Sequence, residues 1–364
     1  MMAFDNAAAR RDWWFLSACA ALFFCGIITM YSLGLAKGQP WAYKQLVFGV
    51  VALVLFVAAA EVPLQIWRRR ALLLVIFAVV LLVAVWLFGA ERKGAQRWLV
   101  VGGLSLQPVE FFKFAALLIG ANFCARAAHT RLGWDLAQPL LLALLIPLAF
   151  LLHQPDAGSF LLIVTVSIAM LFLAGLRMRW FAGGLLSLLA VFGALIAAKP
   201  YILQRLVSFG NPLDDRYGSD YNVALSLMSF ARGGFGGAGG GNLLAGQNLP
   251  EAHNDFIIAA IAEERGLIGF VIVAALLLFV IMRAAAIGLR AAKSGEMFGA
   301  FYAFGFAALA AMQVVINISG SLALLPVKGL TLPLVSYGGS SLTATALMIA
   351  VLMRVDVETR ESGK

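Results

Sequence analysis

ALLLVIFAVVLLVAVWLFG, residues 71–89, carries no charged side chain. About 20 apolar residues in a helix cross the hydrocarbon core of a bilayer, so this run is long enough to span a membrane. The whole chain has the same character, because 62% of its 364 residues are hydrophobic and 12% are charged. A soluble domain is about 45–50% apolar. The composition therefore excludes an ordinary soluble protein and predicts a polytopic membrane protein.

Apolar runs of this kind recur from Trp13 almost to the C-terminus and leave no stretch for a separate soluble domain. We therefore expect an all-α fold of about ten transmembrane helices. The runs lie near residues 13–35, 43–60, 71–89, 109–126, 136–152, 157–175, 180–198, 256–286, 298–320 and 335–353. The run at 256–286 is too long for one straight span and contains EERG at 263–266, so we expect a tilt or a break there.

The distribution of positive charge predicts the orientation of the chain. The net charge of +9 comes from Lys and Arg residues in short clusters between apolar runs. Such clusters are typical of cytoplasmic loops rather than of a nucleic-acid-binding surface. All of them fall on one side if every run spans, so both termini are expected in the cytoplasm. The expected division is a cytoplasmic segment at 1–12, one transmembrane domain at 13–355 and a cytoplasmic tail at 356–364.

Four connections are then left for the outer face, at residues 91–108, 153–156, 199–254 and 321–334. The longest lies between the seventh and eighth helices and contains the glycine-rich stretch GGFGGAGGG at 233–241. This stretch lacks the preceding strand and the terminal Gly-Lys-Ser/Thr of a phosphate-binding loop. We therefore predict a flexible connector. Asp255, which follows it, faces outward.

A first candidate site is GAQRWLVVGGLSLQPVEFFKFA, residues 94–115. Pro108 suits the first position of a helix, Glu110 then lies in its positive first turn, and Lys113 follows on the same face. A well-capped helix with a local ion pair explains these residues without a site. However, Lys113 lies more than a turn inside a spanning helix, where an amine needs a partner or a watery cavity. We favour the cavity over snorkelling, whereas Trp98 fits an interfacial aromatic belt equally well.

A second candidate site is NLPEAHNDFIIAAIAEERG, residues 248–266, which places Glu251, His253 and Asp255 before an apolar helix. Capping by Asn254 or His253, with Asp255 at the positive end of the helix dipole, is the simpler interpretation. The position of these groups on the same side as Lys113 favours chemistry instead. A carboxylate at the mouth of a cavity can act as a general base while cations hold a phosphorylated leaving group.

Long motifs in these regions carry a resemblance to a known family. They are LPEAHNDFIIAAIAEERGLIG at 249–269, GAQRWL at 94–99, SLQPVEFFKFA at 105–115, QPDAGS at 154–159, YGSDYNVALSL at 217–227 and LLPVKGLTLPLVSYGGSS at 324–341. The chain thereby resembles the SEDS family (shape, elongation, division and sporulation), the peptidoglycan polymerases of RodA/FtsW type. The resemblance covers nearly the whole chain. The form PVKGLTLPLVSYGGSS is closer to the division branch than to the elongation branch.

The resemblance implies an activity and a location. The family polymerises lipid II into glycan strands on the outer face of the bacterial cytoplasmic (inner) membrane, with inversion at the anomeric carbon and release of undecaprenyl pyrophosphate. It also implies a class B penicillin-binding protein as partner, together with other division or elongation proteins. The small-residue run AFGFAALAA at 303–311 could accept the partner's membrane helix, and packing inside the bundle explains it equally well.

The resemblance also implies roles for individual residues. Asp255 matches the catalytic aspartate, as the base or as the group that orients the nucleophile. Residues expected to bind substrate are Lys113, Glu110, Trp98, Arg97, His253, Glu251, Lys328 and Ser336. A divalent cation such as Mg²⁺ or Mn²⁺ at the pyrophosphate is left open, because no cluster of carboxylates defines a metal site.

Three alternative functions remain at this point. They are a transporter that moves lipid II across the membrane, an elongation-type polymerase, and a non-catalytic scaffold for the penicillin-binding protein. A transporter predicts charged groups near the midplane of the membrane. The ionisable groups gather on the outer side instead, so an enzyme is favoured.

Overall fold

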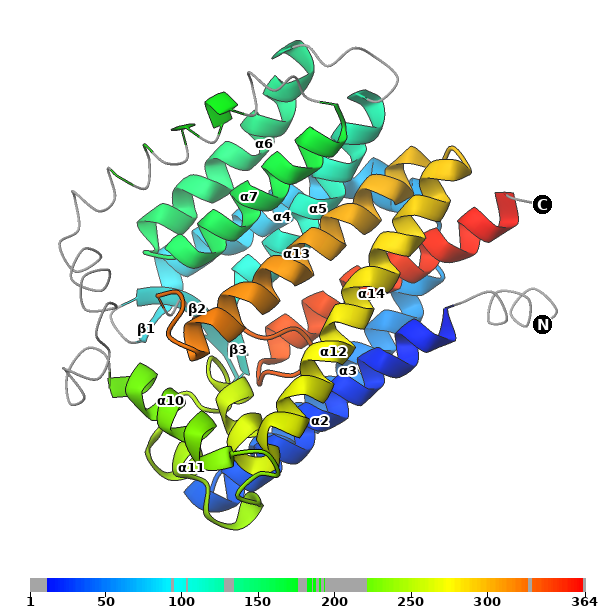
Figure 1. The fold of residues 1–364 in the computed structure, drawn as a ribbon. Helices are drawn as coiled ribbons and strands as arrows, with labels where there is room; N and C mark the ends of the chain where they lie inside the picture. Colours follow the sequence, from blue (N-terminus) through cyan, green and yellow to red (C-terminus); the bar gives the residue numbers. More distant parts are fainter. Residues whose placement is uncertain are drawn as a thin grey trace.

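The computed structural model shows a bundle of long helices, with both termini near one end and a small sheet at the other (Figure 1). The structure describes residues 12–92, 95–102, 104–127, 134–175, 182–184, 186, 187, 190, 193, 221–326 and 329–362. The long helices are α2 (Trp13–Lys37), α3 (Trp41–Ala60), α4 (Leu64–Phe88), α5 (Pro108–Ala127), α6 (Trp134–His153), α7 (Ala157–Leu173), α12 (Ile257–Lys293), α13 (Met297–Ser321) and α14 (Gly339–Ser362). Seven of these described helices are long and apolar enough to cross a membrane. The predicted run at 180–198 lies largely outside the described residues.

The expectation of an all-α fold is wrong in one segment. Residues 90–106 form three short strands, β1 (Ala90–Arg92), β2 (Ala95–Val101) and β3 (Leu104–Leu106), in one antiparallel sheet. In the pairing of β2 with β3, Val101 lies opposite Leu104, and Gly102 adopts a left-handed conformation with φ of 58°. Glycine reaches this conformation without steric cost, so the chain turns back after β2, and β3 ends directly before α5.

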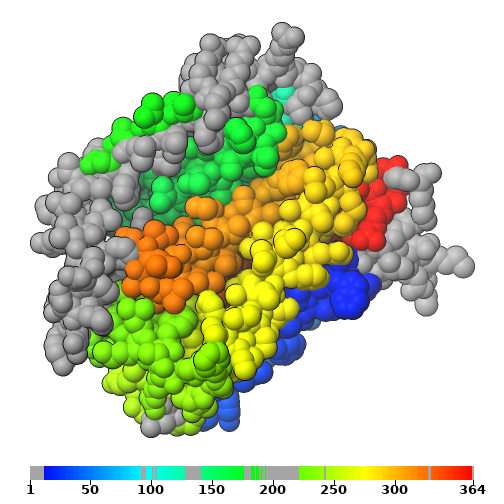
Figure 2. Space-filling view, in the orientation of Figure 1, coloured from blue at the N-terminus to red at the C-terminus, as the bar shows by residue number. Residues whose placement is uncertain are grey.

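The helices divide into inner and outer ones. Within the apolar window of α5, 83% of the residues are buried, and the values for α14 and α13 are 72% and 67%. The corresponding values for α3, α4 and α12 are 22%, 28% and 28%. Their exposed side chains are large and apolar, as at Val50, Phe88 and Ile268, which is the surface that lipid tails require. Figure 2 shows α12, in yellow, exposed along the face of the molecule.

The small-residue run at 303–311 lies inside the bundle. Ala303, Gly305 and Ala310 on α13 are buried, and a Cβ at Gly305 would lie 2.7 Å from Sδ of Met170 on α7. This run therefore serves close packing between helices, and the idea that it accepts a partner's helix is wrong.

The predicted break in the eighth apolar run is confirmed at Gly266, which has φ of 67° and ψ of −167° within α12. A break leaves backbone groups without helical partners, and the glycine-rich tract 233–241 satisfies them. The amides of Ala238 and Gly239 donate to the carbonyls of residues 263 and 264, at 2.8 and 3.1 Å. The amide of Leu267 donates to Gly234 at 2.8 Å. The tract is thus an ordered partner of the helix, and its prediction as a flexible connector is wrong.

Part of the long connection before α12 is helical. It contains α10 (Tyr221–Gly233), the single turn η1 (Gly240–Asn242) and α11 (Leu244–Asn248). The carboxylate of Glu263 accepts hydrogen bonds from the amides of Leu244 and Ala245, at 2.6 and 2.8 Å, and so caps α11. Together with β1–β3, these elements build the end of the molecule that lies away from the termini (Figure 1).

The opposite end carries a network of arginines and buried acids. Arg283 and Arg290 on α12 pair with Asp12 and Asp356, and Arg360 on α14 also pairs with Asp356. The side chains of Asp12 and Asp356 are 1% and 0% exposed. Positive charge therefore gathers at the end that holds both termini, as the sequence predicts.

Candidate functional site

Asp255 lies in a turn just before α12 rather than inside a helix. The amides of Asp255 and Phe256 both donate to the carbonyl of Glu251, at 3.0 and 3.4 Å. The cap position of α12 is Phe256, which has no side-chain hydrogen bond to the helix. Capping by Asn254 or His253 is therefore wrong as an explanation of these polar residues.

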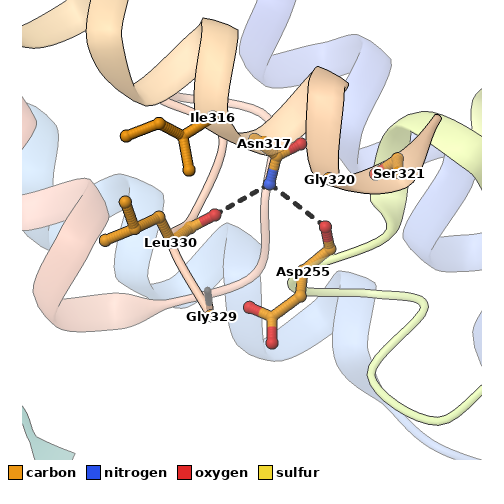
Figure 3. Close-up of a pocket in the computed structure, with 7 residues that line it drawn as sticks. All are labelled: Asp255, Ile316, Asn317, Gly320, Ser321, Gly329 and Leu330. Carbon is orange, nitrogen blue, oxygen red and sulfur yellow. Dashed lines mark hydrogen bonds between the residues drawn. The ribbon is translucent and has the colours of Figure 1, made fainter. Parts of the chain in front are cut away.

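The carboxylate of Asp255 faces a pocket between α13 and the segment that precedes α14 (Figure 3). About 210 Å³ around the pocket is free of protein atoms, with the open solvent at its mouth included, and its lining is Asp255, Ile316, Asn317, Gly320, Ser321, Gly329 and Leu330. A Cβ built at Gly329 would lie 3.6 Å from Oδ2 of Asp255. The backbone next to the carboxylate is therefore close and unobstructed.

The turn at 336–341, which leads into α14, joins the site to α3 and to the segment before α5. Gln45 on α3 donates from Nε2 to the carbonyl of Ser336 at 3.2 Å and accepts from the amide of Gly338 at 3.2 Å. The amide of Gln107, directly before α5, donates to Oγ of Ser340 at 3.0 Å. The turn thus holds the start of α5 beside the start of α14.

Ser336 itself lies between two loops. Its hydroxyl donates to the carbonyl of Asn254 at 2.7 Å and accepts from the amide of Leu332 at 2.9 Å. The side chain is therefore committed to protein contacts through one donor and one acceptor site. A contact of Ser336 with substrate remains a prediction. The hydroxyl oxygen has one further lone pair that could accept a hydrogen bond from substrate.

His253 is partly buried and contacts two aromatic rings. Trp41 at the start of α3 stacks on its imidazole, with centroids 4.0 Å apart and an interplanar angle of 10°. Tyr337 lies on it at 5.4 Å in a tilted arrangement. Burial raises the pKa of the Tyr337 phenol above its ordinary value, so this ring stays neutral beside His253 at neutral pH. Glu251, two residues earlier, has a left-handed backbone with φ of 56°.

Glu110 and Lys113 form an ion pair inside the first turns of α5. Nζ of Lys113 lies 2.7 Å from a carboxylate oxygen of Glu110, and the two side chains are 1% and 7% exposed. The sequence interpretation of a local ion pair is confirmed. The predicted contact of Lys113 with substrate, or with Asp255, stays a prediction.

Arg97 and Trp98 belong to β2. The guanidinium of Arg97 donates from Nε to the carbonyl of Gln154 at 3.1 Å and from a terminal nitrogen to Pro155. It therefore ties the sheet to the connection between α6 and α7. Trp98 lies opposite Ala90 in β1 and is partly buried. Lys328 lies outside the described residues.

The structure thus brings the predicted site residues together in groups. Asp255, His253 and Ser336 meet through the turn before α12, Glu110 pairs with Lys113 on α5, and Arg97 lies with Trp98 in the sheet. Sequence reasoning missed Asn317, whose amide contacts the backbone of Asp255. A polar side chain in an apolar helix is the signal that could have found it.

The described residues include no group of three or more His, Cys, Asp or Glu side chains arranged to hold a metal ion. The fold and the site together define a polytopic membrane protein with a carboxylate-lined pocket at the end of the bundle away from the termini.

The sequence of this chain matches a family of known proteins. The model of the family described as "Cell cycle protein", which groups FtsW, RodA and SpoVE, matches residues 13–361. The chain belongs to this family. It is 38% identical over 364 residues to a probable peptidoglycan glycosyltransferase FtsW of Coxiella burnetii, with 96% of each chain covered. It is 34% identical to the protein of the same description from Escherichia coli O157:H7, covering 95% of this chain and 85% of that one.

Solved structures give the same result. A chain of a peptidoglycan synthase complex that coordinates polymerization and crosslinking matches with a TM-score of 0.80 at 29% identity, covering 96% of this chain and 98% of that one. The rod shape determining protein RodA of Thermus thermophilus matches with a TM-score of 0.70 at 28% identity, covering 95% and 96%.

Proposed function

We propose that this chain is a peptidoglycan glycosyltransferase that polymerises lipid II into glycan strands during cell division. The observation that carries the proposal is the position of Asp255, whose carboxylate lines a pocket beside Gly329 at the end of the bundle opposite the termini. The relatives described as FtsW support the division role.

The proposed reaction is a single displacement. The 4-hydroxyl oxygen of the acceptor GlcNAc forms a bond to the anomeric carbon of the donor MurNAc. The bond from that carbon to the phosphate oxygen breaks, and its electron pair leaves with undecaprenyl pyrophosphate. The hydroxyl proton passes to the carboxylate of Asp255, which acts as general base. Attack opposite to the leaving group converts the α-linked donor into a β-linkage.

The remaining predicted residues supply binding in this proposal. Lys113 is the cation for the pyrophosphate, and Glu110 pairs with the buried amine and orients it until substrate arrives. Arg97 and Trp98 lie on β2, which leads through β3 directly into α5. A substrate contact from this sheet would therefore fall beside that of Lys113.

A divalent cation, Mg²⁺ or Mn²⁺, is part of the proposal only as a companion of the substrate. Mg²⁺ is commonly held by one or two carboxylates together with substrate phosphates. Asp255 is committed to the reacting hydroxyl on the other face of the sugar, and the described residues include no cluster of ligands for a resident ion, so the cation would be one that the pyrophosphate brings in. Such a cation would neutralise charge on the leaving group.

The proposed topology has about ten spans in the bacterial cytoplasmic membrane, with the site facing outward. It is supported by the arginine network beside both termini, because positive charge marks the cytoplasmic side.

The proposed partner is a class B penicillin-binding protein that cross-links the new strands. The similar chain from a complex that coordinates polymerization and crosslinking supports such a partner.

The test is glycan formation from purified lipid II in liposomes, with and without the class B partner. We expect polymer from the wild type and none from Asp255→Asn, which keeps the size of the side chain but cannot accept the proton. The control is Glu358→Gln at the opposite end, where the carboxylate accepts from Leu64 and Arg354 at 3.0 and 2.7 Å. It should polymerise normally.

Two outcomes would contradict the proposal. Polymer of normal length from Asp255→Asn would show that Asp255 is not the general base. Absence of polymer from the wild type even with the partner, together with movement of labelled lipid II across the bilayer, would favour the transporter.

A further inference from the structure

Three successive carbonyls around Asp255 are each held by a different donor. The carbonyl of His253 accepts from the amide of Tyr337 at 2.9 Å, and that of Asn254 accepts from Oγ of Ser336 at 2.7 Å. The carbonyl of Asp255 accepts from Nδ2 of Asn317 at 3.1 Å. The turn that carries the carboxylate is therefore fixed through its main chain.

Asn317 contributes more than one of these bonds. Its Nδ2 also donates to the carbonyl of Leu330 at 2.7 Å, so one amide group joins the Asp255 turn to the segment 329–330 (Figure 3). Both partners are carbonyl oxygens, so only the NH₂ end of the amide can make these contacts, and its orientation is determined. Asn317 is 6% exposed, inside α13.

The two segments that Asn317 joins both line the pocket, together with α13 itself. Asp255 supplies the carboxylate on one side, and Gly329 supplies the backbone that lies next to it on the other. Main-chain bonds hold the turn while the carboxylate extends away from the Asn317 amide (Figure 3). Asn317 therefore acts with Ser336 and Tyr337 to hold the carboxylate at its distance from the opposite wall of the pocket, and of these three it alone bonds the main chain of Asp255 itself.

We propose that Asn317 is a positioning residue that sets the place of the Asp255 carboxylate for proton transfer. The inference rests on the proposed function of Asp255 as base. Removal of the amide releases the carbonyl of Asp255 and the carbonyl of Leu330 together, and the carboxylate shifts relative to the reacting hydroxyl. A misplacement of about 1 Å is enough to lower a rate about a hundredfold.

A purely structural role is the alternative, because any buried amide that bridges two elements adds stability. Asn122 on α5 provides the matched control. Its side chain accepts from Nε of Arg68 at 3.1 Å and donates to the carbonyl of Arg68 at 3.4 Å. It is 9% exposed and lies toward the other end of α5 from Glu110 and Lys113.

The experiment compares wild type, Asn317→Leu, Asn317→Asp and Asn122→Leu, each purified with the class B partner. We measure the maximal rate of glycan formation, the lipid II concentration at half-maximal rate, and the melting temperature. Asn317→Leu should lower the maximal rate about a hundredfold with little change in half-saturation. Asn317→Asp keeps the shape of the side chain but cannot donate both hydrogen bonds, so it should show the same loss of maximal rate. It replaces Asn317→Leu in the comparison if the Leu variant folds poorly. Asn122→Leu should lose stability and keep the maximal rate.

Hydrogen–deuterium exchange gives a readout that does not need activity. Peptides covering residues 251–256 should exchange faster in both Asn317 variants and at the wild-type rate in Asn122→Leu. Unchanged exchange would overturn the positioning role even if the wild type made no glycan. A near-normal maximal rate, an equal loss in Asn122→Leu, or a change confined to half-saturation would also overturn it. Failure of the proposed function itself would appear separately, as absence of polymer from the wild type.

Discussion

The contact between the glycine tract and the break in α12 predicts a severe effect of Gly266→Ala. Gly266 has φ of 67° and ψ of −167°, a region that is almost restricted to glycine. A Cβ there would lie 2.3 Å from the carbonyl oxygen of Phe235 and 2.5 Å from the amide nitrogen of Gly237. Both neighbours are backbone atoms, so no side-chain rotation can relieve the clash.

The magnitude follows from what must move. The backbone conformation alone costs an alanine about 2 kcal/mol. Relief of the clash displaces residues 234–239 and weakens the bonds from Leu267 to Gly234, from Ala238 to Glu263 and from Gly239 to Glu264. Each such bond contributes about 1 kcal/mol. We therefore expect a destabilisation of about 5 kcal/mol, above the ~0.5–3 kcal/mol of most substitutions.

The assay is thermal unfolding of purified protein in detergent, followed by intrinsic tryptophan fluorescence. The control is Gly38→Ala, because Gly38 also has a left-handed φ of 64° but a Cβ there meets nothing within 4 Å. Conformational strain without a clash should cost about 1 kcal/mol. Equal shifts of the melting temperature in the two variants would refute the tight packing of the glycine tract against α12.

Two further predictions concern the substrate. Lys113→Met should destabilise the chain by about 3–5 kcal/mol, because it leaves Glu110 buried without its cation. The double variant with Glu110→Gln and Lys113→Met should regain most of the stability but bind lipid II weakly. Wild-type kinetics in the double variant would exclude a contact between Lys113 and the pyrophosphate. Chelation of divalent cations should slow glycan formation, and added Mg²⁺ should restore it. The melting temperature without substrate should stay constant, because the described residues hold no resident metal site. Activity that persists in the chelator would show that the reaction needs no divalent cation.

Seven of the ten predicted apolar runs coincide with described helices that are long and apolar enough to span a membrane, and the predicted break in α12 is confirmed, because both depend on local properties. The apolar run at 71–89 lies within α4 up to Phe88, with Gly89 as the C-cap of that helix, and the charged residues before Gly266 mark the place where the helix cannot continue unchanged. The ion pair of Glu110 with Lys113 is also local, since residues three apart lie on one helical face.

The sheet is missed for a different reason. Its strands are short, and a search for spanning runs passes over the two glycines between LVV at 99–101 and LSL at 104–106. That pair of glycines is a hairpin signal. The glycine tract at 233–241 is misjudged because its composition gives no information about a partner. Glycine permits flexibility in isolation and close backbone contact when a broken helix lies beside it.

The acids before and within α12 show what sequence alone cannot separate. Glu263 caps α11 and pairs with Arg232, and Glu264 accepts from the hydroxyls of Thr29 and Ser32 at 3.0 and 2.7 Å. Both therefore use their carboxylates to hold the break together. Asp255 contacts Asn317 through its main-chain carbonyl, and its carboxylate lines the pocket. In the proposed function, a base that is fixed through its backbone presents its carboxylate to the substrate, and this arrangement depends on contacts between residues far apart in the chain.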